Sequence, residues 1–236
     1  MLRDAIVSLL NRQPIDIYDV IAGVLATLFV VFLILPLHEF AHAWMARKCG
    51  DRTAEYAGRL TMNPMASFDP VGCLCMIFIG FGWAKPVPVN ARYFRNPRRD
   101  SALVALAGPV SNILAAMVGY FIYYAIIAFV PVKSVLMYQV LSYVLLFFSY
   151  YISFNVSLAV FNLLPVPPLD GSRVITSFLP YRWAYLYNRY QRELYMVFLL
   201  MLWMGVLSRP MGFLSGWIHT GLSFVCGLPF RLLGLL

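Results

Sequence analysis

The stretch Ile34–Trp44, ILPLHEFAHAW, places three ionisable side chains directly after a segment that carries no charge. Residues 20–37 contain no Asp, Glu, Lys or Arg and are typical of a membrane helix, where ionisable groups are costly and usually functional. His38 and His42 are four residues apart and share one helix face, with Glu39 beside them. This H-E-x-x-H pattern is typical of a zinc site with a glutamate base, although two histidines capping a helix end are the plainer alternative.

The composition indicates an integral membrane protein. Of the 236 residues, 61% are hydrophobic and 12% are charged, whereas a soluble domain has about 25% charged residues. The formal net charge of +8 comes from basic residues between apolar segments, where it sets orientation in the bilayer, so we expect no nucleic-acid partner. The cysteines lack the paired spacing of a structural zinc site, and we expect reduced packing residues at Cys49, Cys73, Cys75 and Cys226.

The apolar segments predict an all-α polytopic membrane protein with four to six transmembrane helices. A span needs about 20 apolar residues, which residues 16–45, 101–132 and 134–164 provide. The first of these is long enough to remain as a span rather than be cleaved as a signal. A shorter segment at 194–208, beginning near residue 185, is expected to be the next span. Residues 211–230 either span or lie partly in the interface.

The residues between the first two spans predict a small β-rich region. TAEYAGRLTMNP (53–64) mixes polar and apolar residues, and WAKPVPVNARYF (83–94) is extended by its prolines, so both favour short strands. VGCLCMIFIGFGW (71–83) is too short to cross a bilayer and return, which favours a re-entrant or interfacial segment. Such backbone is tolerated at membrane depth beside a polar cavity, so we expect this region next to the active site.

The basic residues predict an orientation. Nine Lys and Arg lie between residues 47 and 99, and four more lie between 170 and 193. The positive-inside rule assigns both regions to the cytosol and the amino terminus to the outside. The end of the first helix that carries His38 and His42 then lies near the cytosolic face.

A catalytic zinc ion usually has three protein ligands, so a third ligand is needed. His219 is the remaining histidine, and its glycine-rich surroundings favour an interfacial or packed role. Asp170 follows the proline-rich stretch NLLPVPPL, where a helix must end, and can turn inward at that break. It could equally cap a helix that begins at Ser172. Spacing alone leaves these two roles of Asp170 open.

These motifs resemble the site-2 protease family of intramembrane zinc metalloproteases, in its compact branch without a peptide-binding insert. The resemblance covers residues 30–180 and rests on four motifs in order: HEFAHAW, GFGWAKPVPVNARYF, ALAGPVSNILAA and FNLLPVPPLDGSR. It implies that one zinc ion per chain is bound by His38, His42 and Asp170. It also implies that Glu39 acts as the general base.

The resemblance gives Asn162 a role in steadying the substrate or the developing oxyanion. An amide suits this role because it donates hydrogen bonds without charge, while a helix–helix hydrogen bond is the alternative. In the GPVSN segment we expect Asn112 mainly to pack. We expect Gly108 and Pro109 to permit close helix approach rather than to contact substrate.

The implied function is hydrolysis of peptide bonds within or near the transmembrane segments of membrane-protein substrates, by zinc-activated water. We expect a multi-pass protein of a prokaryotic plasma membrane, with its site towards the cytosolic face by the positive-inside rule. The sequence leaves the oligomeric state open. We expect one domain over residues 1–236, with a catalytic core at 16–183, the β-rich block at 47–100 and C-terminal helices at 184–236. The extended segments of that block could pair with an unwound substrate strand.

Two other classes of function fit part of the pattern. An ion or proton transporter could use the intramembrane His, Glu and Asp cluster, and helices broken by Gly and Pro suit that class. The sequence has no internal repeat to support it. A catalytically inactive relative that only binds membrane helices is the second alternative, and the intact Glu39 speaks against it.

Overall fold

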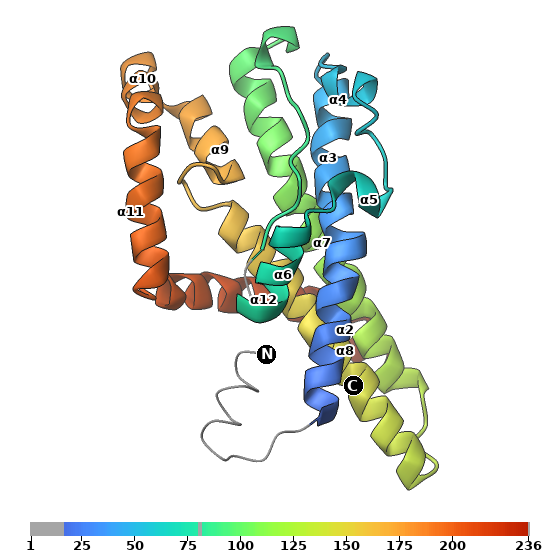
Figure 1. The fold of residues 1–236 in the computed structure, drawn as a ribbon. Helices are drawn as coiled ribbons and strands as arrows, with labels where there is room; N and C mark the ends of the chain where they lie inside the picture. Colours follow the sequence, from blue (N-terminus) through green and yellow to red (C-terminus); the bar gives the residue numbers. More distant parts are fainter. Residues whose placement is uncertain (1–16, 80–81, 236) are drawn as a thin grey trace.

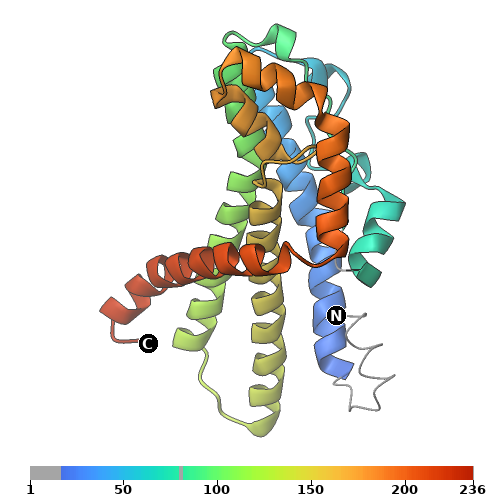
Figure 2. The same ribbon diagram turned by 90° about the vertical axis from the view of Figure 1, so that its left-hand side faces the viewer.

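The computed structural model describes residues 17–79 and 82–235, and their regular structure is entirely helical (Figure 1). Three long helical rods run roughly in one direction, a fourth long helix lies across them, and several short helices gather at one end (Figures 1 and 2). The predicted all-α class is therefore confirmed.

The first long rod combines α2 (Ile17–Phe29), the π-helical turn η1 (Val30–Ile34) and α3 (Leu35–Lys48). Pro36 explains the wide turn, because its ring nitrogen cannot donate the hydrogen bond that a regular α-helix requires there. The N–H that follows the turn bonds a carbonyl five residues back, as a π-helix requires. The irregular turn thus directly precedes the histidines of α3.

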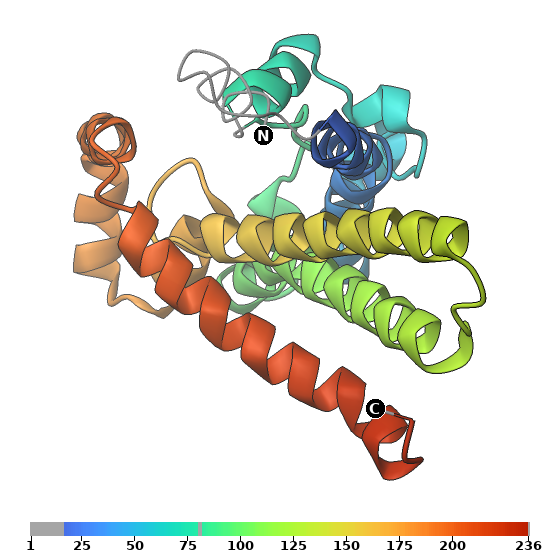
Figure 3. The same ribbon diagram turned by 90° about the horizontal axis from the view of Figure 1, so that it is seen from below.

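The next two rods form an antiparallel hairpin. α7 (Pro97–Phe129) and α8 (Val135–Asn162) are joined by a short loop and lie side by side (Figures 1 and 3). α2 packs against α8, whereas α3 packs against α7. α9 (Asp170–Phe178) also packs against α7. As a result, α7 is the shared wall at which α3 and α9 meet.

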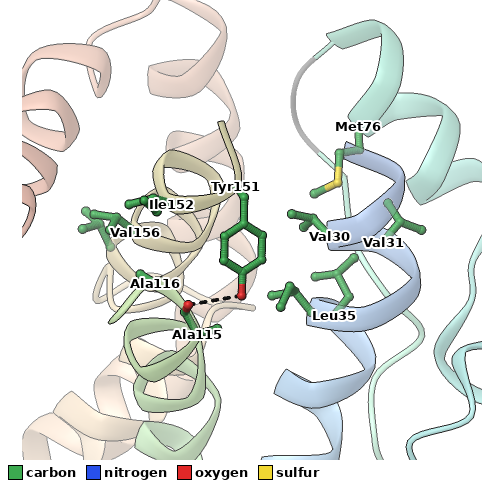
Figure 4. Close-up of a cluster of buried hydrophobic side chains, with 11 residues drawn as sticks. Val30, Val31, Leu35, Met76, Ala115, Ala116, Tyr151, Ile152 and Val156 are labelled. Atoms are coloured by element: carbon green, nitrogen blue, oxygen red, sulfur yellow. Dashed lines mark hydrogen bonds between the residues drawn. The ribbon is translucent and has the colours of Figure 1, made fainter. Parts of the chain in front are cut away.

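Apolar side chains from the first rod, α7 and α8 form the core between them (Figure 4). Tyr151 reaches from α8 towards α7, where its hydroxyl donates a hydrogen bond to the Ala115 carbonyl at 3.1 Å. Gly119 lets the two helices approach, because a Cβ there would lie 2.7 Å from the Tyr151 ring. These contacts fix the register of α7 against α8.

Four helical segments of the described residues are long and apolar enough to cross a membrane: Ile17–Lys48, Pro97–Phe129, Val135–Asn162 and Ser208–Leu232. Exposed side chains on α7 and α8 include many large apolar ones, such as Leu114, Val118 and Phe121, which suits contact with lipid. The last segment, α12, lies across α7 and α8 rather than along them (Figure 2). The four candidate spans among the described residues agree with the predicted four to six transmembrane helices.

The span predicted at 194–208, beginning near residue 185, is wrong. A break at Tyr190 separates α10 (Tyr181–Arg189) from α11 (Gln191–Trp203). The 13 residues of α11 extend about 20 Å, which is less than the roughly 30 Å of a bilayer core. Phe198 of α11 is buried against the segment around Leu169, whereas Met196, Val197 and Leu200 are exposed.

The strands predicted within residues 47–100 are wrong, since the described residues of this region contain none. Residues 84–90 have no regular secondary structure, and the prolines at positions 86 and 88 cannot donate to a strand ladder. The first predicted strand begins as a single helical turn, and the apolar segment after it is a helix of 10 residues, about 15 Å long. The short helices of this region are α4 (Thr53–Tyr56), α5 (Pro64–Ser67), α6 (Pro70–Ile79) and η2 (Ala91–Tyr93).

Candidate metal centre

Three potential metal ligands converge where α3 and α9 meet α7. His38 and His42 lie one turn apart on α3, and their Nε2 atoms are 3.0 Å from each other. Asp170 is the first residue of α9, and its Oδ2 lies 3.3 Å from Nε2 of His38 and 3.2 Å from Nε2 of His42. Both histidines are buried. Elsewhere in residues 17–79 and 82–235, no further group of His, Cys, Asp and Glu converges in this way.

Hydrogen bonds to α7 fix the tautomer of each imidazole. His38 Nδ1 lies 3.1 Å from Asn112 Oδ1, and His42 Nδ1 lies 2.7 Å from the Val104 carbonyl oxygen. Both partners are acceptors, so each Nδ1 carries the hydrogen and donates it. The lone pair of each neutral ring is therefore on Nε2, the atom that faces Asp170. Orientation of a ligand histidine through its other nitrogen is the usual arrangement in metal sites.

The three converging atoms are all acceptors, and this arrangement fits a cation. Oδ2 of Asp170 is buried and has no hydrogen-bond donor among the described residues. Aspartate carboxyls are ordinarily ionised at neutral pH. An anionic oxygen facing two lone pairs is repulsive unless a cation lies among them.

The donor set and the spacing both suit zinc. Two imidazole nitrogens and one carboxylate oxygen form a ligand set used by catalytic zinc, which keeps its fourth position open. Tetrahedral zinc with ligand bonds of about 2.0–2.2 Å separates neighbouring ligand atoms by roughly 3.3–3.5 Å. The separations here are 3.0, 3.2 and 3.3 Å. His38, His42 and Asp170 could thus hold the ion with little movement.

Gly108 of α7 keeps this space open. A Cβ added at this position would lie 2.6 Å from Nε2 of His38 and closer still to Nε2 of His42. No side chain larger than hydrogen fits there unless the imidazoles shift. The prediction that Gly108 permits close helix approach is therefore incomplete, because the residue also borders the candidate metal site.

Glu39 lies next to this group and is partly buried. Its Oε2 accepts a hydrogen bond from the backbone N–H of Val87 at 2.9 Å. Within the described residues, Glu39 forms no salt bridge. A carboxylate with one oxygen held and one oxygen free is suited to accept and return a proton.

Neither Asn162 nor His219 makes a hydrogen bond to the three ligands among the described residues. Asn162 is the last residue of α8 and is partly buried, with no side-chain hydrogen bond to another described residue. His219 lies on α12, where its Nδ1 is 2.8 Å from the hydroxyl of Tyr120. His219 is absent from the metal-ligand group found in the described residues. The structure therefore brings together His38, His42 and Asp170, with Glu39 beside them.

Asn112 is the site residue whose role the sequence did not predict. We expected it mainly to pack, and it is fully buried, but its carbonyl oxygen also accepts the hydrogen bond from His38. One signal was present, because Gly108 and Asn112 are four residues apart and share a helix face. Nothing in the sequence indicated that this face of α7 meets α3.

The fold and the site together define a helical protein with four candidate membrane spans, in which two histidines and an aspartate that could hold a metal ion lie beside a glutamate. The sequence model of Peptidase family M50 matches residues 26–205, and the chain belongs to this family. This membership confirms the resemblance seen in the sequence motifs.

Curated relatives come from bacteria and archaea. YwhC of Bacillus subtilis is 45% identical over 154 residues, which cover 65% of this chain and 68% of YwhC. Rip2 of Mycobacterium tuberculosis is 33% identical over 157 residues, covering 64% of this chain and 56% of Rip2. MJ0611 of Methanocaldococcus jannaschii is 28% identical over 150 residues, covering 62% of this chain and 66% of MJ0611. All three are provisionally named zinc metalloproteases. No solved structure matches the chain.

Proposed function

We propose that this protein is an intramembrane zinc metalloprotease that hydrolyses peptide bonds within or near transmembrane segments. The observation that carries the proposal is the convergence of His38 Nε2, His42 Nε2 and Asp170 Oδ2 to within 3.0–3.3 Å of one another. Membership of a peptidase family supports hydrolysis rather than transport as the use of this site. The names of the relatives support zinc as the metal.

The chain's own residues divide the chemistry among them. His38, His42 and Asp170 hold the metal, and Asn112 and the Val104 carbonyl orient the two imidazoles. Zinc, when bound, supplies a Lewis acid that lowers the pKa of water towards about 7. Glu39 accepts a proton from the attacking water and later returns it to the leaving amine. Both proton transfers use the carboxylate oxygen that Val87 does not hold.

Asn162 is proposed to donate its amide N–H to the substrate carbonyl as that oxygen becomes anionic. It ends α8 eight residues before Asp170, and its side chain has no other hydrogen-bond partner among the described residues. A neutral amide stabilises negative charge as an oxyanion-hole donor does.

Transmembrane helices are the proposed substrates, in the plasma membrane of a prokaryote. The apolar outer faces of α7 and α8 suit burial in lipid, which would put the site within reach of other membrane segments. A helical substrate must unwind first, because its carbonyls are occupied by intrahelical hydrogen bonds. The density of Lys and Arg around residues 47–99 supports a cytosolic location for this end of the molecule.

Metal removal tests the proposal. The purified protein, treated with a chelator, should lose the ability to cut a model transmembrane segment and should regain it when zinc is added back. Metal analysis of the active preparation should find one zinc ion per chain. Undiminished cleavage by a preparation shown to be free of metal would contradict the proposed function.

A further inference from the structure

The segment Pro86–Val87–Pro88 contains a single backbone N–H, because proline has none. That N–H belongs to Val87, and it donates to Oε2 of Glu39 at 2.9 Å. The two residues are 48 positions apart, and Val87 contributes no polar side chain. The contact is therefore made by the backbone alone.

The segment is anchored on both sides of Val87. Before it, the Lys85 N–H donates to the Ser67 carbonyl at 2.9 Å. After it, the Asn90 N–H donates to the buried carboxylate of Asp51 at 2.7 Å, just beyond the end of α3. Val89 packs against the cluster formed by buried side chains of α3 and α7. These bonds hold the Val87 N–H at a fixed position relative to α3, the helix that carries Glu39.

We propose that the backbone N–H of Val87 is a positioning group for the general base, and this inference rests on the proposed function. It holds Oε2 of Glu39 and leaves Oε1 as the oxygen that exchanges the proton. The flanking prolines stiffen the segment and offer Glu39 no competing donor. Val87 touches neither substrate nor metal in this role and acts only through Glu39.

Pairing with a substrate strand is the competing use of this segment. From residue 85 to residue 90 the N–H groups of Lys85, Val87 and Asn90 are already bonded within the protein, and two positions are prolines. Among these six residues, only the N–H of Val89 has no hydrogen-bond partner in the described part of the chain. A strand ladder needs alternating donors and acceptors, so this segment has little to donate to a substrate.

Two proline substitutions separate these uses. Val87→Pro deletes the N–H that holds Glu39, whereas Val89→Pro deletes the neighbouring free N–H from the same kind of residue in the same extended segment. Val87→Ala and Val89→Ala control for the loss of each side chain. Initial rates on a model transmembrane substrate give kcat and KM, and zinc content and thermal unfolding are measured on the same preparations.

Val87→Pro should lower kcat by about 10- to 100-fold, the effect of losing a hydrogen bond to a charged group, with KM and zinc content nearly unchanged. The other three variants should keep kcat within about threefold of wild type. Should Val87→Pro fail to fold, replacement of Val87 by its α-hydroxy acid removes the N–H as an ester and should give the same loss of kcat.

Two results would overturn the inference while leaving the protease intact. One is a wild-type kcat in a zinc-loaded Val87→Pro or ester variant when Glu39→Gln is inactive. The other is a rise in KM alone, which would assign the segment to substrate pairing. By contrast, no cleavage by zinc-loaded wild-type protein would contradict the proposed function itself.

Discussion

Side chains of helix α7 engage a histidine at two places, and the two places differ in what surrounds the second ring nitrogen. At one, Asn112 accepts a hydrogen bond from Nδ1 of His38 at 3.1 Å. Eight residues further on, the Tyr120 hydroxyl lies 2.8 Å from Nδ1 of His219. In both cases Nδ1 is engaged by a side chain of α7 and Nε2 faces away from it.

The difference lies in the neighbouring elements. Next to His38, a second histidine one turn along α3 and a carboxylate at the start of α9 face Nε2. Next to His219, α12 contributes a serine, Ser223, which pairs with Tyr124 of α7. An orienting hydrogen bond therefore occurs at both positions, but only convergence of three elements produces a ligand set. The His219 position serves to attach α12 to α7.

The largest difference should come from replacing each of the two histidines by alanine in separate variants. His38→Ala should abolish zinc binding and lower cleavage roughly 10³-fold or more, because the remaining two ligands cannot hold the ion or organise the general base. His219→Ala should leave zinc content and cleavage near wild type. Metal analysis and a cleavage assay on both variants measure this. Full zinc content in His38→Ala would break the comparison.

Gly108→Ala should have the next largest effect, since its Cβ would meet both imidazoles. A displacement of catalytic groups by about 1 Å can lower activity about 10²-fold. Alanine favours helix formation over glycine, so a loss of activity would report the clash rather than a weaker α7. The matched control is Gly216→Ala on α12, where a Cβ would meet nothing within 4 Å. Unchanged zinc affinity in Gly108→Ala would contradict the site geometry.

Asn112→Leu should weaken zinc binding about 10- to 100-fold, the usual effect of removing an orienting partner of a metal ligand. Without Asn112 the hydrogen of His38 is no longer fixed on Nδ1, so its lone pair is no longer committed to the metal. Competition with a calibrated zinc chelator measures the affinity. Tyr120→Phe removes the corresponding partner of His219 and should leave the affinity unchanged. An equal loss of zinc affinity in both variants would mean that Asn112 has no special role in orienting a metal ligand.

The smallest effect should be on stability. Tyr120→Phe removes one interhelical hydrogen bond between α7 and α12, which is worth about 0.6 kcal/mol within membranes. The free energy of unfolding in detergent micelles should fall by that amount, with no change in cleavage. A loss of cleavage instead would indicate that α12 affects the site through α7.

Local pattern was enough to predict one half of the candidate site. His38, Glu39 and His42 lie within five consecutive residues, and helical periodicity alone puts both histidines on one face. Asp170 is 128 residues further along the chain than His42, and spacing left its role open. Asn112 and Val87 could not be assigned, because their roles depend on which faces of α7 and of an irregular segment meet α3.

The predicted strands failed for a related reason. The prolines of residues 83–94 favoured an extended strand, and part of this segment is extended. It cannot join a β-ladder, because two of its residues are prolines and other N–H groups already donate to Glu39 and Asp51. The predicted span at 194–208 failed because periodicity does not locate a break such as that at Tyr190. Local conformation was thus better predicted than the partners of each segment.

Glu39→Gln is the measurement that tests the central claim most directly. The amide keeps the shape of the side chain and leaves His38, His42 and Asp170 in place, so zinc should remain bound at the wild-type level. What is lost is the group that moves the proton, and general acid–base catalysis contributes about 10²–10⁴-fold. We expect the rate of cleavage of a model transmembrane segment to fall by about 10⁴-fold, the upper end of that range. Zinc content is measured on the same preparation. Wild-type cleavage by zinc-loaded Glu39→Gln protein would contradict the assignment of this site as a metalloprotease centre.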